Sequence, residues 1–172
     1  VQLWYKKAKE HHPTVVYFPG NAQSLGNRSE RFSEIAKTGY GVLAVSYRGY
    51  GQSEGYPSEQ GLYSDARGAM SYATTQLNIP SRQMILYGES LGTAVATYAA
   101  TEYAVGGVIL DSPPISVLAR GKELYPYVPV EWLIKDVFPT IDRISKIGAP
   151  LLILHGGADS VIPVEHGRKL YE

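Results

Sequence analysis

The stretch Tyr87-Gly88-Glu89-Ser90-Leu91-Gly92 decides the fold of this chain. An apolar run from Gln83 to Tyr87 leads into it, and a run of small residues from Leu91 to Ala100 follows at once. A strand that becomes a helix within two residues must bend sharply, and glycines are needed on both sides of the apex because a Cβ there would collide with neighbouring backbone. The spacing therefore predicts a strand–turn–helix that presents the Ser90 hydroxyl, with the helix N-terminus behind it favouring developing negative charge.

Similar apolar runs recur along the chain and are separated by helical patterns. Strands are expected at residues 1–5, 14–18, 41–46, 83–87, 106–110 and 150–154, and helices at residues 27–38, 58–77, 91–100 and 165–172. Ser58 follows a proline and is the expected N-cap of the second helix. Apolar strands without alternation, joined through helices, indicate an α/β fold with a mostly parallel sheet covered on both faces. We expect residues 1–172 to form a single domain of this kind.

The composition narrows the classes of function. Hydrophobic residues make up 44% and charged residues 19%, and 16 basic residues balance 16 acidic ones, so nothing indicates a nucleic-acid partner. The absence of cysteine excludes disulfides and thiol catalysis, and no metal or other cofactor is expected. No apolar run reaches the length of a membrane span and no signal peptide is visible, which leaves a cytoplasmic or a membrane-peripheral location open. Because the sequence opens on Val1 rather than Met, we expect that something precedes it.

Chemistry in a parallel sheet lies beyond the carboxyl ends of the strands. Five loops meet at that edge in the predicted arrangement, namely residues 19–22, 48–53, 88–92, 111–114 and 155–159. The loop that holds Ser90 is central among them. Ser90 is therefore the leading candidate for a functional side chain.

Four segments at this edge resemble the motifs of the α/β-hydrolase superfamily, in its order and at its usual spacing. They are Tyr-Phe-Pro-Gly-Asn-Ala at 17–22, Tyr-Arg-Gly-Tyr-Gly-Gln-Ser-Glu-Gly at 47–55, Gly-Glu-Ser-Leu-Gly at 88–92 and Leu-His-Gly-Gly-Ala-Asp-Ser-Val-Ile-Pro at 154–163. The set is similar to the small serine hydrolases without a lid domain that include acyl-protein thioesterase-like and depalmitoylase-like members. The resemblance implies a hydrolase of carboxylic esters or thioesters.

The resemblance also implies roles for individual residues. Ser90 matches the nucleophile, the backbone N–H of Leu91 matches one donor of the oxyanion hole, and that of Asn21 or Ala22 matches the other. Asp159 matches the acid that orients a histidine base. Asp111 lies at a strand end on the same edge and is the alternative acid.

The base is harder to assign. His11 and His12 precede a strand and lie at the wrong edge, and His155 matches a turn position of the family. His166 follows Asp159 by only seven residues and is kept as a minor candidate for the base. We expect instead that about 25 to 40 further residues, with a helix, a strand and the histidine, follow residue 172.

Other positions carry a structural and a functional interpretation. Arg48 and Tyr50 are expected to shape the loop beside the serine, and Asp65 to be solvated or paired. The aromatic stretch from Leu124 to Ile134 is expected to pack on the core between two strands. The alternatives for this stretch are an acyl-chain pocket or contact with a membrane surface.

Three functions remain open on the sequence. The first is a serine hydrolase that acts on a small-molecule or lipid-like acyl ester through an acyl-enzyme on Ser90. The second is a scaffold or binding protein with the same fold but without catalysis. The third is a nucleotide-binding module, indicated only by Gly49-x-Gly51 after a strand, because Glu54 stands where the fingerprint requires a third glycine.

Overall fold

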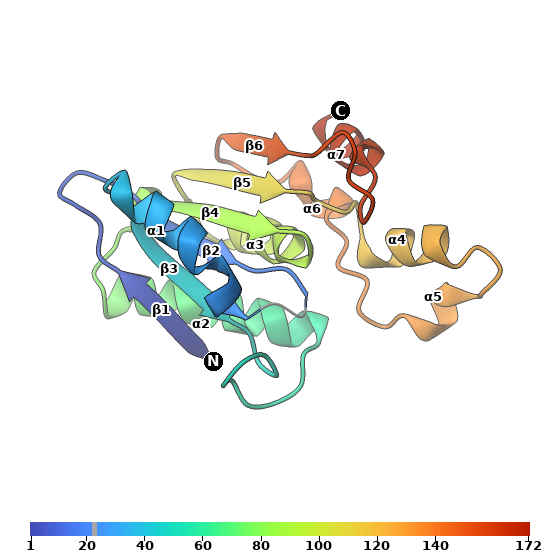
Figure 1. The fold of residues 1–172 in the computed structure, drawn as a ribbon, viewed down its shortest axis with the longest axis horizontal. Helices are drawn as coiled ribbons and strands as arrows, with labels where there is room; N and C mark the ends of the chain where they lie inside the picture. The colour runs from blue at the N-terminus through green and yellow to red at the C-terminus, as the bar shows by residue number, and fades with distance from the viewer. Residues whose placement is uncertain (22–23) are drawn as a thin grey trace.

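The computed structural model describes residues 1–21 and 24–172, which form a sheet with the strand order β1-β3-β2-β4-β5-β6. The strands are β1 (Gln2–Lys6), β2 (Thr14–Phe18), β3 (Gly41–Ser46), β4 (Met84–Glu89), β5 (Gly107–Asp111) and β6 (Leu151–Leu154). Strand β1 is antiparallel to β3 at one edge, and every other neighbouring pair is parallel (Figure 1). The predicted mostly parallel sheet is confirmed.

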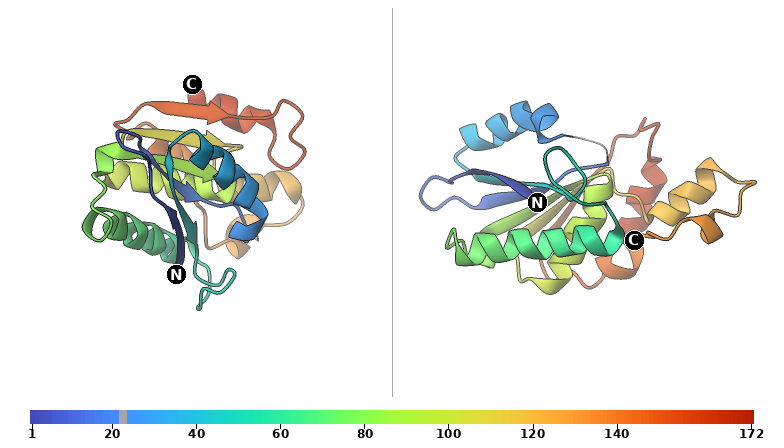
Figure 2. Two further views of the ribbon diagram at one scale, coloured as in Figure 1. Left: turned by 60° about the vertical axis from the view of Figure 1, so that its left-hand side comes forward. Right: turned by 90° about the horizontal axis from the view of Figure 1, so that it is seen from below.

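Helices cover both faces of this sheet. The 3-10 helix η1 (Leu25–Arg28) and α1 (Ser29–Lys37) lie on one face, and α2 (Glu59–Thr75) and α3 (Leu91–Glu102) lie on the other (Figure 2). The predicted N-cap of α2 is confirmed, because the Ser58 hydroxyl accepts a hydrogen bond from the Gly61 N–H at 3.1 Å. The remaining elements are the short η2 (Ser81–Gln83), α4 (Val117–Leu124), α5 (Val130–Leu133), α6 (Ile141–Ile144) and α7 (Val164–Tyr171).

The two faces of the central strands bury different cores. Tyr17 packs toward α1 together with Phe32, while its neighbours Val16 and Phe18 pack on the opposite side with the side chains of α2 and α3. Burial on both faces explains why β2 and β3 read as continuous apolar runs rather than alternating ones. Strand β6 differs, because it lies at the edge of the sheet and Leu152 is half exposed.

Residues 116–138 leave the sheet after β5 and project beyond its carboxyl edge as α4, a loop and α5 (Figures 1 and 2). The expectation that the aromatic stretch packs on the core is wrong for most of it, since Tyr127 is 98% and Trp132 84% exposed. The two helices pack on each other instead, so closely that a Cβ on Gly121 would lie 2.6 Å from the Ile134 side chain. The segment thus forms a helical hairpin of its own, and the aromatic side chains on its outer side are exposed. In the part of the chain that the structure describes, none of the helices is long and apolar enough to cross a membrane.

Candidate active site

The predicted sharp turn stands at the end of β4. Ser90 has a φ of 51° and a ψ of −118°, and α3 begins at the next residue. A Cβ on Gly88 would lie 2.5 Å from the Gly92 carbonyl oxygen, and one on Gly92 would lie 2.0 Å from the Phe18 carbonyl oxygen. Both glycines are therefore required by close backbone contact, which is the physical basis of the Gly-x-Ser-x-Gly spacing.

The backbone of Ser90 is hydrogen-bonded on both sides, whereas its hydroxyl makes no hydrogen bond to α3. Its N–H donates to the Asp111 carbonyl oxygen at 2.8 Å, and its carbonyl oxygen accepts from the Thr93 N–H and hydroxyl. The Ser90 side chain makes no capping hydrogen bond to α3. The first N–H of a helix has no acceptor within the helix, so α3 leaves the Leu91 N–H without an intrahelical partner beside the serine.

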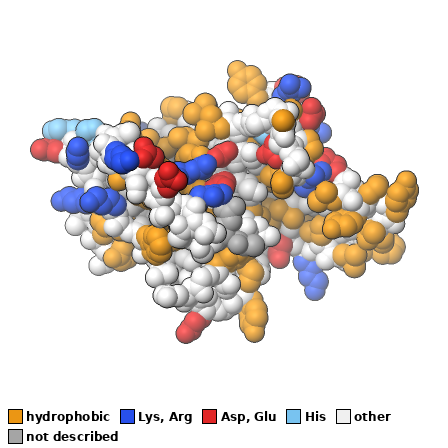
Figure 3. All heavy atoms as spheres, in the orientation of Figure 1, with side chains coloured by type: hydrophobic (Ala, Val, Ile, Leu, Met, Phe, Trp, Pro, Cys, Tyr) orange, Lys and Arg blue, Asp and Glu red, His pale blue; other side chains and the backbone are white. Residues whose placement is uncertain are grey.

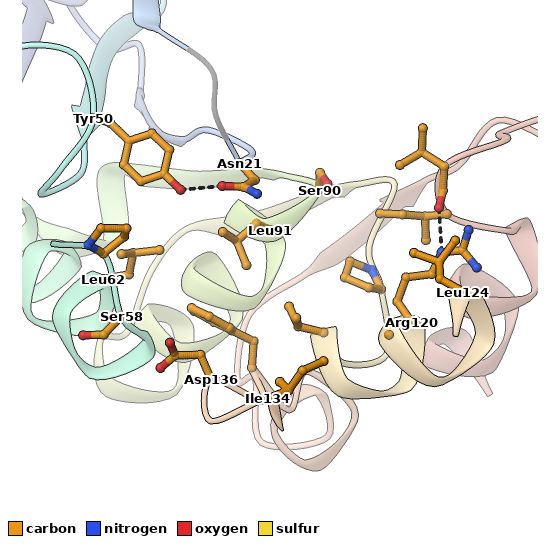
Figure 4. A pocket seen from close by; sticks show the side chains of 17 residues that line it. Asn21, Tyr50, Ser58, Leu62, Ser90, Leu91, Arg120, Leu124, Ile134 and Asp136 are labelled. Atoms are coloured by element: carbon orange, nitrogen blue, oxygen red, sulfur yellow. Dashed lines mark hydrogen bonds between the residues drawn. The ribbon is translucent and has the colours of Figure 1, made fainter. Parts of the chain in front are cut away.

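A cavity of about 470 Å³ opens in front of Ser90. Figure 4 shows Asn21, Ser90 and Leu91 close together on one wall and Leu124 and Arg120 of α4 facing them. The Tyr50 hydroxyl donates to the Asn21 side-chain oxygen at this wall. Most of the lining is apolar, including Leu62, Leu91, Val117, Leu124, Ile134, Phe138, Val161 and Ile162. The other predicted oxyanion-hole residue, Ala22, lies outside the described residues.

Asp159 follows β6 and is held by the turn after it. Its Oδ1 accepts from the N–H groups of Val161 and Ile162 at 2.8 and 2.9 Å. The hydrogen bond from the Ile162 N–H, with smaller contributions from Ser112 and Val161, holds the pKa of Asp159 below its ordinary value. A carboxylate that stays ionised and fixed in direction is suited to orient a histidine.

The alternative acid, Asp111, is engaged on the α1 face of the sheet. Its Oδ2 accepts from the Tyr87 hydroxyl at 2.7 Å and from Arg31 at 3.0 Å. Because these donors hold the carboxylate toward α1, Asp111 is less suited than Asp159 to orient a base in the cavity.

The histidines are occupied elsewhere. The Nε2 of His155 donates to the Ile162 carbonyl oxygen at 2.8 Å, and this bond fastens the turn that contains Asp159. His166 is buried, with Nδ1 accepting from the Ile115 N–H at 3.1 Å and Nε2 donating to Glu123 at 2.9 Å. His11 and His12 lie exposed before β2. Across residues 1–21 and 24–172, no histidine is hydrogen-bonded to Ser90, so the structure does not bring a base to the serine.

The loop after β3 is shaped as the sequence indicates. Arg48 donates to the buried carboxylate of Asp65 through its backbone N–H, Nε and Nη2, at 2.7 to 3.0 Å, so the predicted pairing of Asp65 is confirmed. Gly49 has a φ of 75°, and a Cβ there would lie 2.7 Å from the Pro57 ring. The tight turn accounts for this glycine without a bound nucleotide.

One group of charged residues beside the serine is not predicted from the sequence. Glu89 accepts hydrogen bonds from Tyr17 and Arg28, and Arg31 lies 3.6 Å from it. The sequence signal for this group is a pair of arginines, Arg28 and Arg31, spaced one helical turn apart. They lie opposite Glu89 and Asp111, the last residues of the neighbouring strands β4 and β5. The pairing could be read only once the positions of α1, β4 and β5 were known.

Comparison with known proteins places the chain in a family. The sequence matches the family described as serine aminopeptidase, S33, over residues 9–143. The chain belongs to this family of α/β-hydrolases. It is similar to alpha/beta hydrolase domain-containing protein 17C of Xenopus tropicalis, with 36% identity over 160 residues, and to lysophosphatidylserine lipase ABHD12 of Danio rerio, with 33% identity over 190 residues.

These matches cover nearly all of this α/β-hydrolase but only part of its relatives. The alignments take in 92% and 98% of the chain, which spans 50% and 49% of the two relatives. Among solved structures, an alpha-beta hydrolase from Vibrio vulnificus has a TM-score of 0.78 and 29% identity, over 92% of this chain and 60% of that one. The fold and the relatives together support a hydrolase.

Proposed function

We propose that this α/β-hydrolase cleaves a carboxylic ester or thioester through an acyl-enzyme on Ser90. The observation that carries the proposal is the position of the Ser90 hydroxyl, at the apex of a turn with positive φ, without a hydrogen bond to α3 and on the wall of an apolar cavity. A serine so placed is presented to a substrate rather than used to cap its helix.

The proposed reaction proceeds in two steps. The Ser90 Oγ attacks the acyl carbon while a histidine takes its proton, and the carbonyl oxygen becomes an oxyanion. The Leu91 N–H and an N–H from the loop after β2, where Asn21 is the described candidate, bind this oxyanion. The tetrahedral intermediate expels the alcohol or thiol, which receives the proton, and water then releases the acid from Ser90 by the same route.

Asp159 is proposed to orient the histidine base. Its Oδ1 is fixed by two backbone N–H groups, and its pKa is lowered, so the carboxylate keeps its charge and direction. Because His155 and His166 are bound to other partners, we propose that the base is a histidine outside this sequence.

The cavity favours an acyl group with an apolar chain. Its lining is mostly aliphatic and aromatic, and burial of each methylene there stabilises a bound chain by about 0.8 kcal/mol. A relative of this chain is named a lysophosphatidylserine lipase, which agrees with a lipid-like ester as the substrate class.

We further propose that the projection of residues 116–138 contacts a lipid surface. Its tip, residues 124–130, has no charged residue and carries Leu124, Tyr125 and Tyr127 exposed, while Lys122 and Glu131 form an ion pair beside it. Hydrophobic side chains gather over this projection in Figure 3. An uncharged, aromatic tip can enter the boundary of a bilayer without desolvating a charge. Leu124 also lines the cavity, so apolar surface continues from the tip toward Ser90.

Labelling of the full-length gene product with a fluorophosphonate probe tests the proposed chemistry. We expect rapid labelling of the wild type, none of Ser90→Ala and unchanged labelling of Ser33→Ala, an exposed serine on α1. Persistent labelling of Ser90→Ala would refute the assignment of the nucleophile.

The scaffold function has one observation in its favour, namely that His155 and His166 are hydrogen-bonded to partners other than Ser90. It predicts that the wild type is not labelled. It further predicts that the cavity binds a long-chain fatty acid without turning over its esters.

A further inference from the structure

Glu89, the residue before the proposed nucleophile, is held from the α1 face of the sheet. Its carboxylate accepts from the Tyr17 hydroxyl and from Arg28, whose Nε lies 2.8 Å from Oε2 and whose Nη2 bonds Oε1. The Glu89 side chain is only 13% exposed. Burial by itself would raise the pKa of Glu89, but the hydrogen bonds from Arg28 and Tyr17 outweigh it and lower the pKa. Glu89 is therefore a fixed anion directly behind the turn.

Arg28 lies at the other end of the segment that begins beside Ser90. The chain leaves β2 at Phe18, and Gly20 then passes so close to the turn that a Cβ on it would lie 3.3 Å from both the Glu89 carbonyl oxygen and the Ser90 Cβ. The segment ends at Arg28, the last residue of η1, which returns to bind Glu89. One end of the segment thus lies against the Glu89 and Ser90 backbone, and the other end is hydrogen-bonded to the Glu89 side chain.

A pair of this kind is poorly explained as a source of stability. Removing two charges from water costs about as much as their attraction returns, and apolar replacements are often equally stable. A bidentate guanidinium–carboxylate pair does fix relative position and direction, because its two parallel hydrogen bonds form in one geometry only. The pair is therefore suited to set geometry.

We propose that Arg28 is a positioning residue that, through Glu89, sets the distance between the Ser90 hydroxyl and the oxyanion-binding backbone at Asn21. This inference rests on the proposed hydrolase function. A displacement of about 1 Å between reacting groups can reduce a rate about 100-fold, so loss of the pair should slow acylation while the apolar cavity still binds substrate.

The test compares variants of the full-length gene product on a soluble short-chain p-nitrophenyl ester and a fluorophosphonate. We expect Arg28→Gln to lower kcat and the rate of labelling by about 10- to 100-fold with KM within about twofold of wild type. Arg28→Lys keeps the charge but not the two parallel bonds, and it should recover only part of the rate. The control is Lys37→Gln, which breaks the exposed ion pair of Lys37 with Glu34 on α1, away from Ser90, and should leave kcat within about threefold.

The possible outcomes separate the two proposals. A wild type that is not labelled overturns the proposed function. A wild type that is labelled, with Arg28→Gln equally fast or with Lys37→Gln as slow as Arg28→Gln, overturns the role of Arg28 alone. If Arg28→Gln does not fold, the double variant Arg28→Gln/Glu89→Gln removes both charges together. Two glutamines cannot reproduce the two parallel hydrogen bonds of the Arg28–Glu89 pair, so the double variant should also have a low kcat. A wild-type kcat in the double variant would overturn the inference.

Discussion

The carboxyl edge of the sheet and the projection of residues 116–138 face the same cavity but are built on opposite principles. At the edge, Gly88 and Gly92 are fixed by backbone contacts that no other residue could make, and the carboxylates of Glu89 and Asp111 are paired. In the projection, one helix packs on another, and the largest apolar side chains, those of Tyr127 and Trp132, face outward.

The difference suggests separate roles for the two regions, with catalysis at the carboxyl edge and substrate recognition in the projection. A rigid edge suits groups that must keep a reaction geometry, because small displacements are costly there. An outward apolar tip contributes little to the stability of the chain and is free to serve recognition. Substitutions at the edge should therefore change folding and kcat, and substitutions at the tip should change only access of a lipid-like substrate.

The largest expected effect concerns Gly92. Gly92→Ala should prevent folding or lower the free energy of unfolding by more than about 4 kcal/mol, because the new Cβ would overlap the Phe18 carbonyl oxygen. Gly68→Ala is the matched control. A Cβ on the exposed helical Gly68 would meet no atom of the described residues within 4 Å, so alanine there should raise the free energy of unfolding by about 0.5–1 kcal/mol. Urea unfolding followed by circular dichroism measures both. A stable Gly92→Ala protein would show that the edge is not rigid.

The second effect separates the two candidate acids. Asp159→Asn should lower kcat by about 10³- to 10⁴-fold, because an amide cannot stabilise a protonated histidine, and Asp111→Asn should lower it by less than about tenfold. Ester hydrolysis by the full-length gene product measures the difference. The opposite order of the two variants would identify Asp111 as the acid and would contradict the role given to the Asp159 turn.

In the projection, the paired substitution Trp132→Ser on α5 and Tyr127→Ser at the tip should leave the free energy of unfolding within about 0.5 kcal/mol of wild type. It should lower binding to phosphatidylcholine vesicles and hydrolysis of a long-chain ester in them by about tenfold or more, while a short soluble ester is cleaved normally. Tyr56→Ser, at an equally exposed tyrosine on another loop, is the control. An equal loss of activity on the long-chain and the short ester would show instead that these side chains maintain the structure of the cavity.

The smallest expected effect is a pH dependence of the free energy of unfolding that comes from Glu89 at the carboxyl edge. The folded pKa of Glu89 is lower than its ordinary value of 4.5, so its contribution to stability is complete above pH 4.5 and is lost as the pH falls through the folded pKa. Wild type should therefore be more stable than Glu89→Gln at pH 7, and the gap should narrow below about pH 4.5. Denaturation curves at several pH values measure it, and a gap that widens in acid would be inconsistent with an ionised Glu89.

The sequence predicts the edge better than the projection for a physical reason. The Gly88–Gly92 spacing and the buried strands are local consequences of sterics and apolar burial, and they can be read from one short window. The course of residues 116–138 depends on whether Val130 and Ile134 find α4 or the core, which is a competition between distant partners. The pairing of Arg28 with Glu89 also joins distant residues, and both residues would otherwise be read as ordinary charges on the surface.

The most direct test of the central claim is to trap the acyl-enzyme. The full-length gene product would be mixed with a long-chain p-nitrophenyl ester whose acyl group leaves the enzyme slowly. The mixture would then be quenched in acid, digested and analysed by mass spectrometry. We expect the added mass of the acyl group on the peptide that contains Ser90. Hydroxylamine should remove this mass, and Ser90→Ala should lack it. Turnover with the acyl group on another residue, or with Ser90→Ala fully active, would contradict it.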